Sequence, residues 1–222
     1  MRTHTKEFQQ NLTPSDAFEV LKDGNKRFIG NLKLNRDLLQ QMDETANGQY
    51  PWAVILSCMD SRTSVEHIFD QGIGDIFSIR IAGNVVNDDI VGSMEYACAV
   101  AGSKLVVVLG HTKCGAIKGA CDHVQLGNLT GLLEKVNPAI EKTAAAAKET
   151  SKESYAEVVA QANVIESMKE ILEKSSILRG LYEEGKIGIV GGIYNVENGK
   201  VSFTRTMFAD QEAVVEESAT TV

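Results

Sequence analysis

The chain has 222 residues, of which 43% are hydrophobic and 23% charged, and its 22 basic and 30 acidic side chains leave a formal net charge of −8. These values are ordinary for one soluble globular domain and exclude collagen-like, disordered and disulfide-dense proteins. The basic residues are scattered, so we expect no nucleic-acid partner, and no apolar run approaches the roughly 18 residues that a membrane span needs.

The first 48 residues are predicted to form a helical arm. The sequence T-P-S-D at 13–16 is a typical helix start, and apolar residues recur at roughly helical spacing through residues 18–29. Two helices are therefore expected within 13–47. This segment has too little sequence to enclose a core of its own, so we expect the arm to pack on the main domain or on a partner subunit.

Residues 49–208 are predicted to form an α/β domain. Apolar runs at 53–56, 75–79, 105–109 and 187–190 alternate with helical stretches, which is typical of a mainly parallel sheet covered by helices on both faces. The helices are expected near 64–70, 88–101 and 114–121, and throughout the Ala/Glu/Lys-rich residues 129–184. An Asn-Gly pair between the runs 193–196 and 201–203 predicts a C-terminal hairpin, and the acidic tail 209–222 is expected to be loose.

Thiol, imidazole and charged side chains follow three of the expected strands, where open α/β sheets bind their ligands. Cys58 follows the first run, and His111 and Cys114 follow the valine-rich third run. Together they make a Cys₂His set, which suits a catalytic zinc ion with a fourth position left open. The alternative is that both cysteines are buried apolar residues and the histidine is a loop residue, because a single His-x-x-Cys is a weak signal.

The role expected of the remaining cysteines depends on where the protein is located. The first ten residues are polar and do not look like a secretory signal. We therefore expect a cytoplasmic protein, in which cysteines serve as metal ligands, catalytic thiols or buried apolar residues rather than disulfides. Cys98 and Cys121 fall within amphipathic helical stretches and are interpreted as core residues. A structural site of four cysteines that includes one of them is the alternative.

Asp60 and Arg62 stand two and four residues after Cys58. A surface ion pair is one interpretation of such a pair. A turn this close to a metal favours another, in which the guanidinium keeps the carboxylate ionised and the carboxylate orients a zinc-bound hydroxide. Asp60 could alternatively bind the zinc ion itself and close the site.

Four motifs taken together resemble the β-class carbonic anhydrases: C-M-D-S-R at 58–62, R-I-A-G-N at 80–84, S-M-E-Y-A at 93–97 and L-G-H-T-K-C-G-A at 109–116. The resemblance implies reversible hydration of CO₂ to bicarbonate and a proton through a zinc-bound hydroxide, with Zn²⁺ on Cys58, His111 and Cys114. It also implies an Asp60–Arg62 dyad beside the metal. The expected assembly is a homodimer or homotetramer in which N-terminal helices embrace the neighbouring subunit.

Within this family, the sequence is more similar to the plant-like type, whose active site is permanently open. Gln49, nine residues before the first cysteine of the set, matches the glutamine that hydrogen-bonds substrate in that type. The substrate pocket is implied at Phe77, Ala82, Tyr96 and Gly115, with alanine at 82 where valine is frequent.

The allosteric type of the family has an inhibitory bicarbonate site made by a tryptophan, an arginine and a tyrosine. Arg80 and Tyr194 match two of these positions, but Ile55 occupies the tryptophan position and Trp52 lies elsewhere. The inhibitory site is therefore expected to be incomplete.

There are three alternatives to CO₂ hydration. Hydrolysis of carbonyl sulfide or carbon disulfide uses the same ligands in related enzymes. A zinc-binding or thiol-based regulatory protein without turnover would use them structurally. A nucleotide-binding domain is disfavoured, because the chain contains neither G-x-G-x-x-G nor G-x-x-x-x-G-K-[ST].

Overall fold

The computed structural model describes residues 2–146, 150–209 and 211–213. The helices are α1 (Lys6–Asn11), α2 (Pro14–Ile29), α3 (Leu38–Thr45), α4 (Val65–Ile68), α5 (Asp88–Glu95), α6 (Gly115–Cys121), α7 (Gly127–Leu133), α8 (Asn137–Thr143), α9 (Lys152–Lys174) and α10 (Ser176–Glu183). The strands are β1 (Ala53–Ser57), β2 (Ile76–Arg80), β3 (Leu105–His111), β4 (Gly188–Tyr194), β5 (Val201–Phe208) and β6 (Gln211–Ala213). None of the described helices combines the length and apolar character that a membrane span requires.

The strands form one sheet in the order β2-β1-β3-β4-β5-β6. The first four strands in this order are parallel, and β5 and β6 join antiparallel at one edge. The carboxyl ends of β1, β2 and β3 therefore lie at the same end of the sheet, as the α/β prediction requires. The predicted hairpin is also confirmed: β4 and β5 are connected by residues 195–200, where Gly199 has a φ of 79° that favours glycine.

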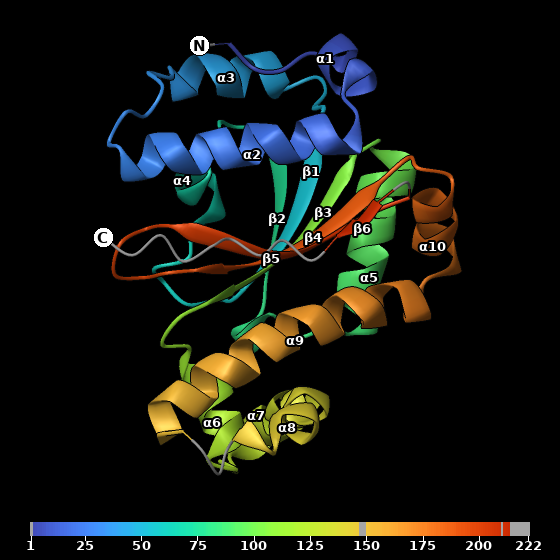
Figure 1. Cartoon of the computed structure of the whole chain (residues 1–222). Coiled ribbons are helices and arrows are strands. Elements are labelled where there is room, and N and C mark those ends of the chain that lie inside the picture. The colour runs from blue at the N-terminus through green and yellow to red at the C-terminus, as the bar shows by residue number, and fades with distance from the viewer. Residues whose placement is uncertain (1, 147–149, 210, 214–222) are drawn as a thin grey trace.

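Alternate residues of the central strands enter two cores, one on each face of the sheet. Ile55 and Val107 face α2 and α4, whereas Val54 and Val106 face α5, α6, α9 and α10. Figure 1 shows α2 on one side of the sheet and α9 on the other. Helices thus cover both faces, which explains why these strands are continuous apolar runs.

Two strand residues without a side chain leave room for helix α9 against the sheet. A Cβ at Gly110 of β3 would lie 2.9 Å from a Val164 methyl group, and one at Gly191 of β4 would lie 2.5 Å from the Met168 sulfur. A larger residue at either position would force these neighbouring side chains to shift. The two glycines therefore fix α9 against the strand that ends at His111.

The first segment of the chain packs on the main domain. The N-terminus of α2 has a capping box, in which Thr13 and Asp16 exchange hydrogen bonds. Ala17, Phe18 and Leu21 of this helix are buried against the sheet. The two helices predicted within 13–47 are confirmed as α2 and α3, and α1 precedes them without having been predicted.

Other differences from the sequence prediction are local. The expected helix 88–101 is α5 followed by a π-helical turn at Tyr96–Val100. The helical stretch 129–184 is divided into separate helices, and residues 144–146 belong to no α-helix. The prediction of a loose tail is wrong for residues 211–213, which form β6 and pair with β5. Residues 214–222 of the tail lie outside the described residues.

Candidate metal centre

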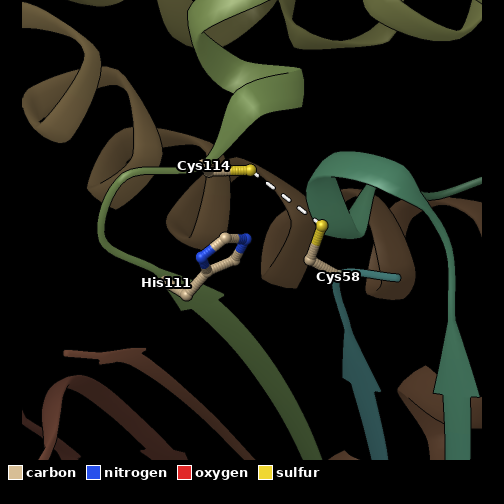
Figure 2. A group of neighbouring side chains, drawn as sticks. All are labelled: Cys58, His111 and Cys114. Atoms are coloured by element: carbon tan, nitrogen blue, oxygen red, sulfur yellow. Dashed lines mark hydrogen bonds between the residues drawn. The ribbon is translucent and has the colours of Figure 1, made fainter. Parts of the chain in front are cut away.

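Three buried side chains meet beyond the carboxyl ends of β1 and β3. Cys58 follows β1, His111 is the last residue of β3, and Cys114 is the N-cap of α6. One ligand atom from each lies within 4.8 Å of the others. Figure 2 shows Cys58 beyond the end of β1, His111 at the end of β3 and Cys114 at the start of α6, with their side chains converging. The structure therefore brings together the Cys₂His set that the spacing suggested.

The distances within this cluster fit a tetrahedral zinc ion. The sulfur atoms of Cys58 and Cys114 are 4.0 Å apart, far too long for a disulfide. Zinc–sulfur bonds of about 2.3 Å in tetrahedral geometry separate two sulfur ligands by about 3.8 Å. The Nε2 atom of His111 is buried and has no hydrogen-bond partner among the described residues. This orphaned nitrogen and the two sulfurs are the donor types that zinc prefers.

The two thiols are electrostatically coupled. A hydrogen bond from Cys114 lowers the pKa of the Cys58 thiol, and the backbone N–H groups of Asp60 and Gly83 contribute in the same direction. The pKa of the Cys114 thiol is raised, because Cys114 donates this hydrogen bond to Cys58 and because it is buried. The two pKa values shift in opposite directions because the sulfurs share one hydrogen bond, and a cation between the sulfurs would favour the thiolate form of both.

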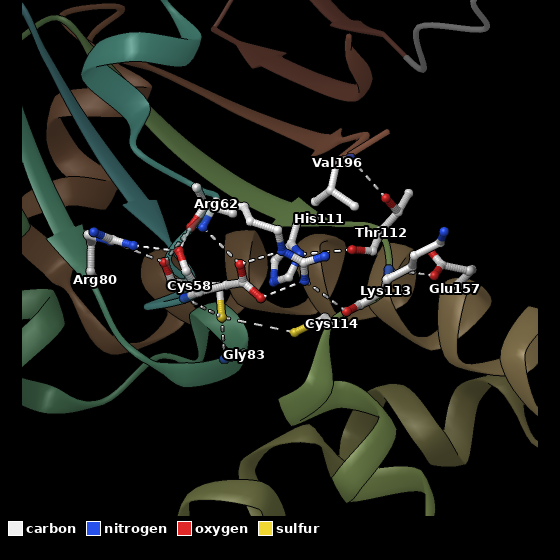
Figure 3. Close-up of polar contacts among 12 residues, drawn as sticks. Cys58, Arg62, Arg80, Gly83, His111, Thr112, Lys113, Cys114, Glu157 and Val196 are labelled. Atoms are coloured by element: carbon white, nitrogen blue, oxygen red, sulfur yellow. Dashed lines mark hydrogen bonds and ion pairs between the residues drawn. The ribbon is translucent and has the colours of Figure 1, made fainter. Parts of the chain in front are cut away.

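The loop that carries Cys114 and the neighbouring 82–84 loop each contain backbone in the left-handed region. Gly83 has a φ of 68° and Lys113 a φ of 55°. The Gly83 N–H lies 3.3 Å from the Cys58 sulfur, and the Gly83 carbonyl accepts a hydrogen bond of 2.9 Å from Asn163 of α9. These contacts, drawn in part in Figure 3, hold the 82–84 loop against the cluster.

Asp60 and Arg62 form the bidentate pair that the sequence suggested. Arg62 Nε donates to one carboxylate oxygen at 2.8 Å and Arg62 Nη2 to the other at 2.7 Å. The Arg62 hydrogen bonds hold the pKa of Asp60 well below its usual range. Arg80 donates to the Asp60 backbone carbonyl at 2.6 Å, so the turn after β1 is held from the β2 side as well.

Comparison with known proteins gives this site a family. The family model of carbonic anhydrase matches residues 53–201. Carbonic anhydrase 2 of Mycobacterium tuberculosis is 35% identical over 86% of this chain and 92% of its own length. The carbonic anhydrase of Mycolicibacterium smegmatis is 34% identical over 86% of this chain and 93% of its own length.

The chain belongs to the β-class carbonic anhydrases. Solved structures agree: a β-carbonic anhydrase of Aspergillus fumigatus superposes with a TM-score of 0.70 and 29% identity, over 85% of this chain and 90% of that one. A β-carbonic anhydrase of Sordaria macrospora, described as tetrameric, has the same fold, with a TM-score of 0.70 at 23% identity over 85% of this chain and 96% of that one.

The remaining predicted site residues of this carbonic anhydrase fall into two groups. Ala82 precedes Gly83 in the loop that contacts Cys58, and Gly115 directly follows Cys114, with open space where a Cβ would stand. Phe77 and Tyr96 lie elsewhere, with their ring centroids 6.2 Å apart. They line an open hollow of about 660 Å³ beside β2 and α5, of which none of the three cluster residues is a wall.

Gln49 lies at the opposite end of the sheet from the cluster. The Gln49 Cβ lies 3.9 Å from the point where a Cβ on Gly74 would stand, and Gly74 lies just before β2. Strand β1 runs between Gln49 and Cys58, and its five residues span about 16 Å at roughly 3.3 Å per residue. Within one chain, Gln49 is therefore out of reach of Cys58.

Sequence reasoning missed the supports that come from α9. Asn163 and Glu157 are separated by 80 and 44 residues from the loop residues that they contact. No local motif marks them. Only the close packing of α9 on β3 and β4, which Gly110 and Gly191 permit, brings them to the site.

Proposed function

We propose that this chain hydrates CO₂ reversibly to bicarbonate and a proton with a zinc ion held by Cys58, His111 and Cys114. The observation that carries the proposal is the buried cluster, whose donor atoms lie within 4.8 Å of one another and include an imidazole nitrogen without a partner among the described residues. A zinc ion bound there supplies a Lewis acid that makes water reactive toward CO₂ near neutral pH. Three protein ligands leave one tetrahedral position for that chemistry.

Asp60 and Arg62 are proposed to act beside the metal. Because the carboxylate is ionised, it only accepts hydrogen bonds, so it would hold a bound O–H group in one orientation. Both carboxylate oxygens accept hydrogen bonds from Arg62, and this pairing would compete with binding of Asp60 at the open zinc position. This two-point contact needs a guanidinium, since lysine lacks the planar fork.

Gln49, Phe77 and Tyr96 are proposed to serve the site of a neighbouring subunit. Gln49 is out of reach of Cys58 in its own chain, whereas Phe77 and Tyr96 line a hollow to which no cluster residue contributes, and Tyr96 keeps 56% of its surface exposed there. A homodimer or homotetramer, with the arm of residues 1–48 packed on its neighbour, would bring these side chains to a second cluster. The Gln49 amide would then donate to a substrate oxygen as it gains charge, as in the plant-like open type.

A cytoplasmic location is also proposed. It is supported by the four cysteines, all of which are free.

The test is stopped-flow CO₂ hydration with metal analysis of the same sample. We expect about one zinc per chain and turnover that is lost in Cys58→Ser, His111→Ala and Cys114→Ser. Cys98→Ser is the matched control, because this buried thiol lies in the π-helical turn and not in the cluster. Full zinc content in Cys114→Ser would refute the ligand assignment. A zinc-loaded parent that hydrolyses carbonyl sulfide or carbon disulfide but does not hydrate CO₂ would refute the reaction.

A further inference from the structure

One peptide group connects Glu157 of α9 to His111. The Lys113 N–H donates to Glu157 Oε1 at 2.7 Å. The carbonyl of the same peptide group, that of Thr112, lies 2.9 Å from His111 Nδ1. Figure 3 shows these residues on the side of the cluster away from Cys58. A carboxylate, a peptide group and an imidazole thus form a continuous hydrogen-bonded path.

The path determines which ring nitrogen of His111 carries the proton. A carbonyl oxygen only accepts hydrogen bonds, so Nδ1 must be the donor in its contact with Thr112. In a neutral imidazole this leaves Nε2 with a free electron pair. Nε2 is the buried nitrogen without a partner among the described residues, and it is the atom available to a metal.

The peptide group needs support because of its backbone conformation. Lys113 has a φ of 55°, which residues other than glycine rarely adopt. The Lys113 side chain pairs with Glu197, but both groups are more than half exposed, so this ion pair restrains the loop weakly. The contact of Arg62 with the Lys113 carbonyl is long, at 3.4 Å. Thr112 is held by its own N–H, which donates to the Tyr194 carbonyl at 2.9 Å, and the bond from the Lys113 N–H to Glu157, at 2.7 Å, restrains the Lys113 side of this peptide.

Glu157 is itself held by a rigid element. Its neighbours Val159 and Ala160 are buried, and α9 is seated against Gly110 of β3, one residue before His111. The helix that presents the carboxylate and the strand that presents the imidazole are therefore in direct contact.

We propose that Glu157 is a positioning residue for His111: through the Thr112–Lys113 peptide it fixes the tautomer and ring orientation that point Nε2 toward the metal. Metal-binding histidines often donate their second N–H directly to a carboxylate or carbonyl, and here one peptide group stands between the two. This inference rests on the proposed zinc function.

The experiment compares Glu157→Ala and Glu157→Gln with the parent as full-length, zinc-loaded protein. Zinc affinity is measured by competition with a chelator. The His111 tautomer is observed by long-range ¹H–¹⁵N spectra of protein labelled only at histidine. The chain has four histidines, so the His111 signals are assigned by substituting the other three, His4, His67 and His123, one at a time.

Removal of the acceptor in Glu157→Ala is expected to weaken zinc binding by about 10–100-fold, as changes behind a metal ligand typically do, and to broaden or shift the His111 Nδ1–H signal. Glu157→Gln keeps an oxygen acceptor and is expected to restore most of both. Glu153→Ala, an exposed acid one turn earlier on α9, is the matched control and should behave like the parent.

Unchanged zinc affinity and an unchanged His111 signal in Glu157→Ala would overturn the proposal, as would an equal loss in Glu157→Gln. If Glu157→Ala folds poorly, the double variant Glu157→Ala/Lys113→Gly provides the test, since glycine adopts the left-handed conformation without strain. It should recover part of the lost affinity, and no recovery would count against the positioning role. A parent without zinc or CO₂ hydration would refute the proposed function instead.

Discussion

Asp70→Asn is expected to destabilise the protein through the charge that it leaves unpaired. The Asp70 side chain is 3% exposed and accepts hydrogen bonds from Arg36, which is 8% exposed, and from Arg27, which is 27% exposed. These contacts attach α2 and the loop after it to the turn that follows α4. Asparagine keeps the shape and tolerates the left-handed φ of 47° at this position, so the substitution isolates the charge.

The size of the effect follows from burial. Removing one partner of a buried ion pair costs about 3–5 kcal/mol, because the other charge remains desolvated. Arg27 is partly hydrated, and Arg36 keeps its bond to the Asp70 backbone carbonyl, so the low end, about 3 kcal/mol, is expected. Urea unfolding at fixed protein concentration and pH 7 measures it, with the single, fully buried Trp52 as the fluorescent probe.

The matched control is Asp23→Asn, which breaks an exposed pair with Lys26 and should change stability by less than about 1 kcal/mol. A loss below about 1 kcal/mol in Asp70→Asn would refute the reasoning.

The pH dependence of this contribution has a definite sign. Burial raises the pKa of Asp70, but hydrogen bonds from Arg27 and Arg36 outweigh it and the net pKa is lowered. Its contribution is therefore present above the unfolded pKa and disappears as the pH falls through the folded pKa, where parent and variant should converge.

Three further predictions concern the site. Asn163→Ala leaves the buried Gly83 carbonyl without its donor, so zinc affinity should fall. Asn163→Asp also lacks the amide donor and should show the same loss. Competition with a chelator measures zinc affinity in both variants. Arg62→Lys should retain zinc but lose CO₂ hydration, because lysine cannot hold both oxygens of Asp60; parent-like turnover would contradict the dyad. Gln49→Ala should also retain zinc and reduce hydration by roughly 10²–10³-fold, the usual loss for one donor to developing charge; an unchanged rate would remove Gln49 from the pocket.

The sequence predicted the fold where local pattern and tertiary role coincide. Strands β1 and β3 are buried on both faces, so their apolar runs were sufficient to locate them. Helix α1 was missed because it has six residues and only Gln9 is buried, which leaves no apolar period to detect. Strand β6 was missed because its three residues form a strand only by pairing with β5.

The candidate site was likewise predictable where its residues lie close together in the sequence. Cys58, Asp60 and Arg62 share one turn, and His111 and Cys114 share another, so short motifs contained most of the cluster. Gln49 could be matched by its spacing from Cys58, but its place at the far end of β1 depends on the sheet. Glu157 could not be found, since its only mark is a hydrogen bond to a backbone 44 residues earlier.

The π-helical turn at Tyr96–Val100 has a consequence for how the chain tolerates changes of length. The Ala101 N–H bonds to the Tyr96 carbonyl, and the Ala97 carbonyl is left for the Ser103 N–H, just before β3. A π turn holds one residue more than an α turn. If a residue were deleted from a connection that has no extra residue to lose, β3 would shift its register by one position. His111 would then point to the opposite face of the sheet. Deletion of the exposed Val100 should instead convert this turn to α-helix, so that an evolutionary loss of one residue here would leave His111 in place.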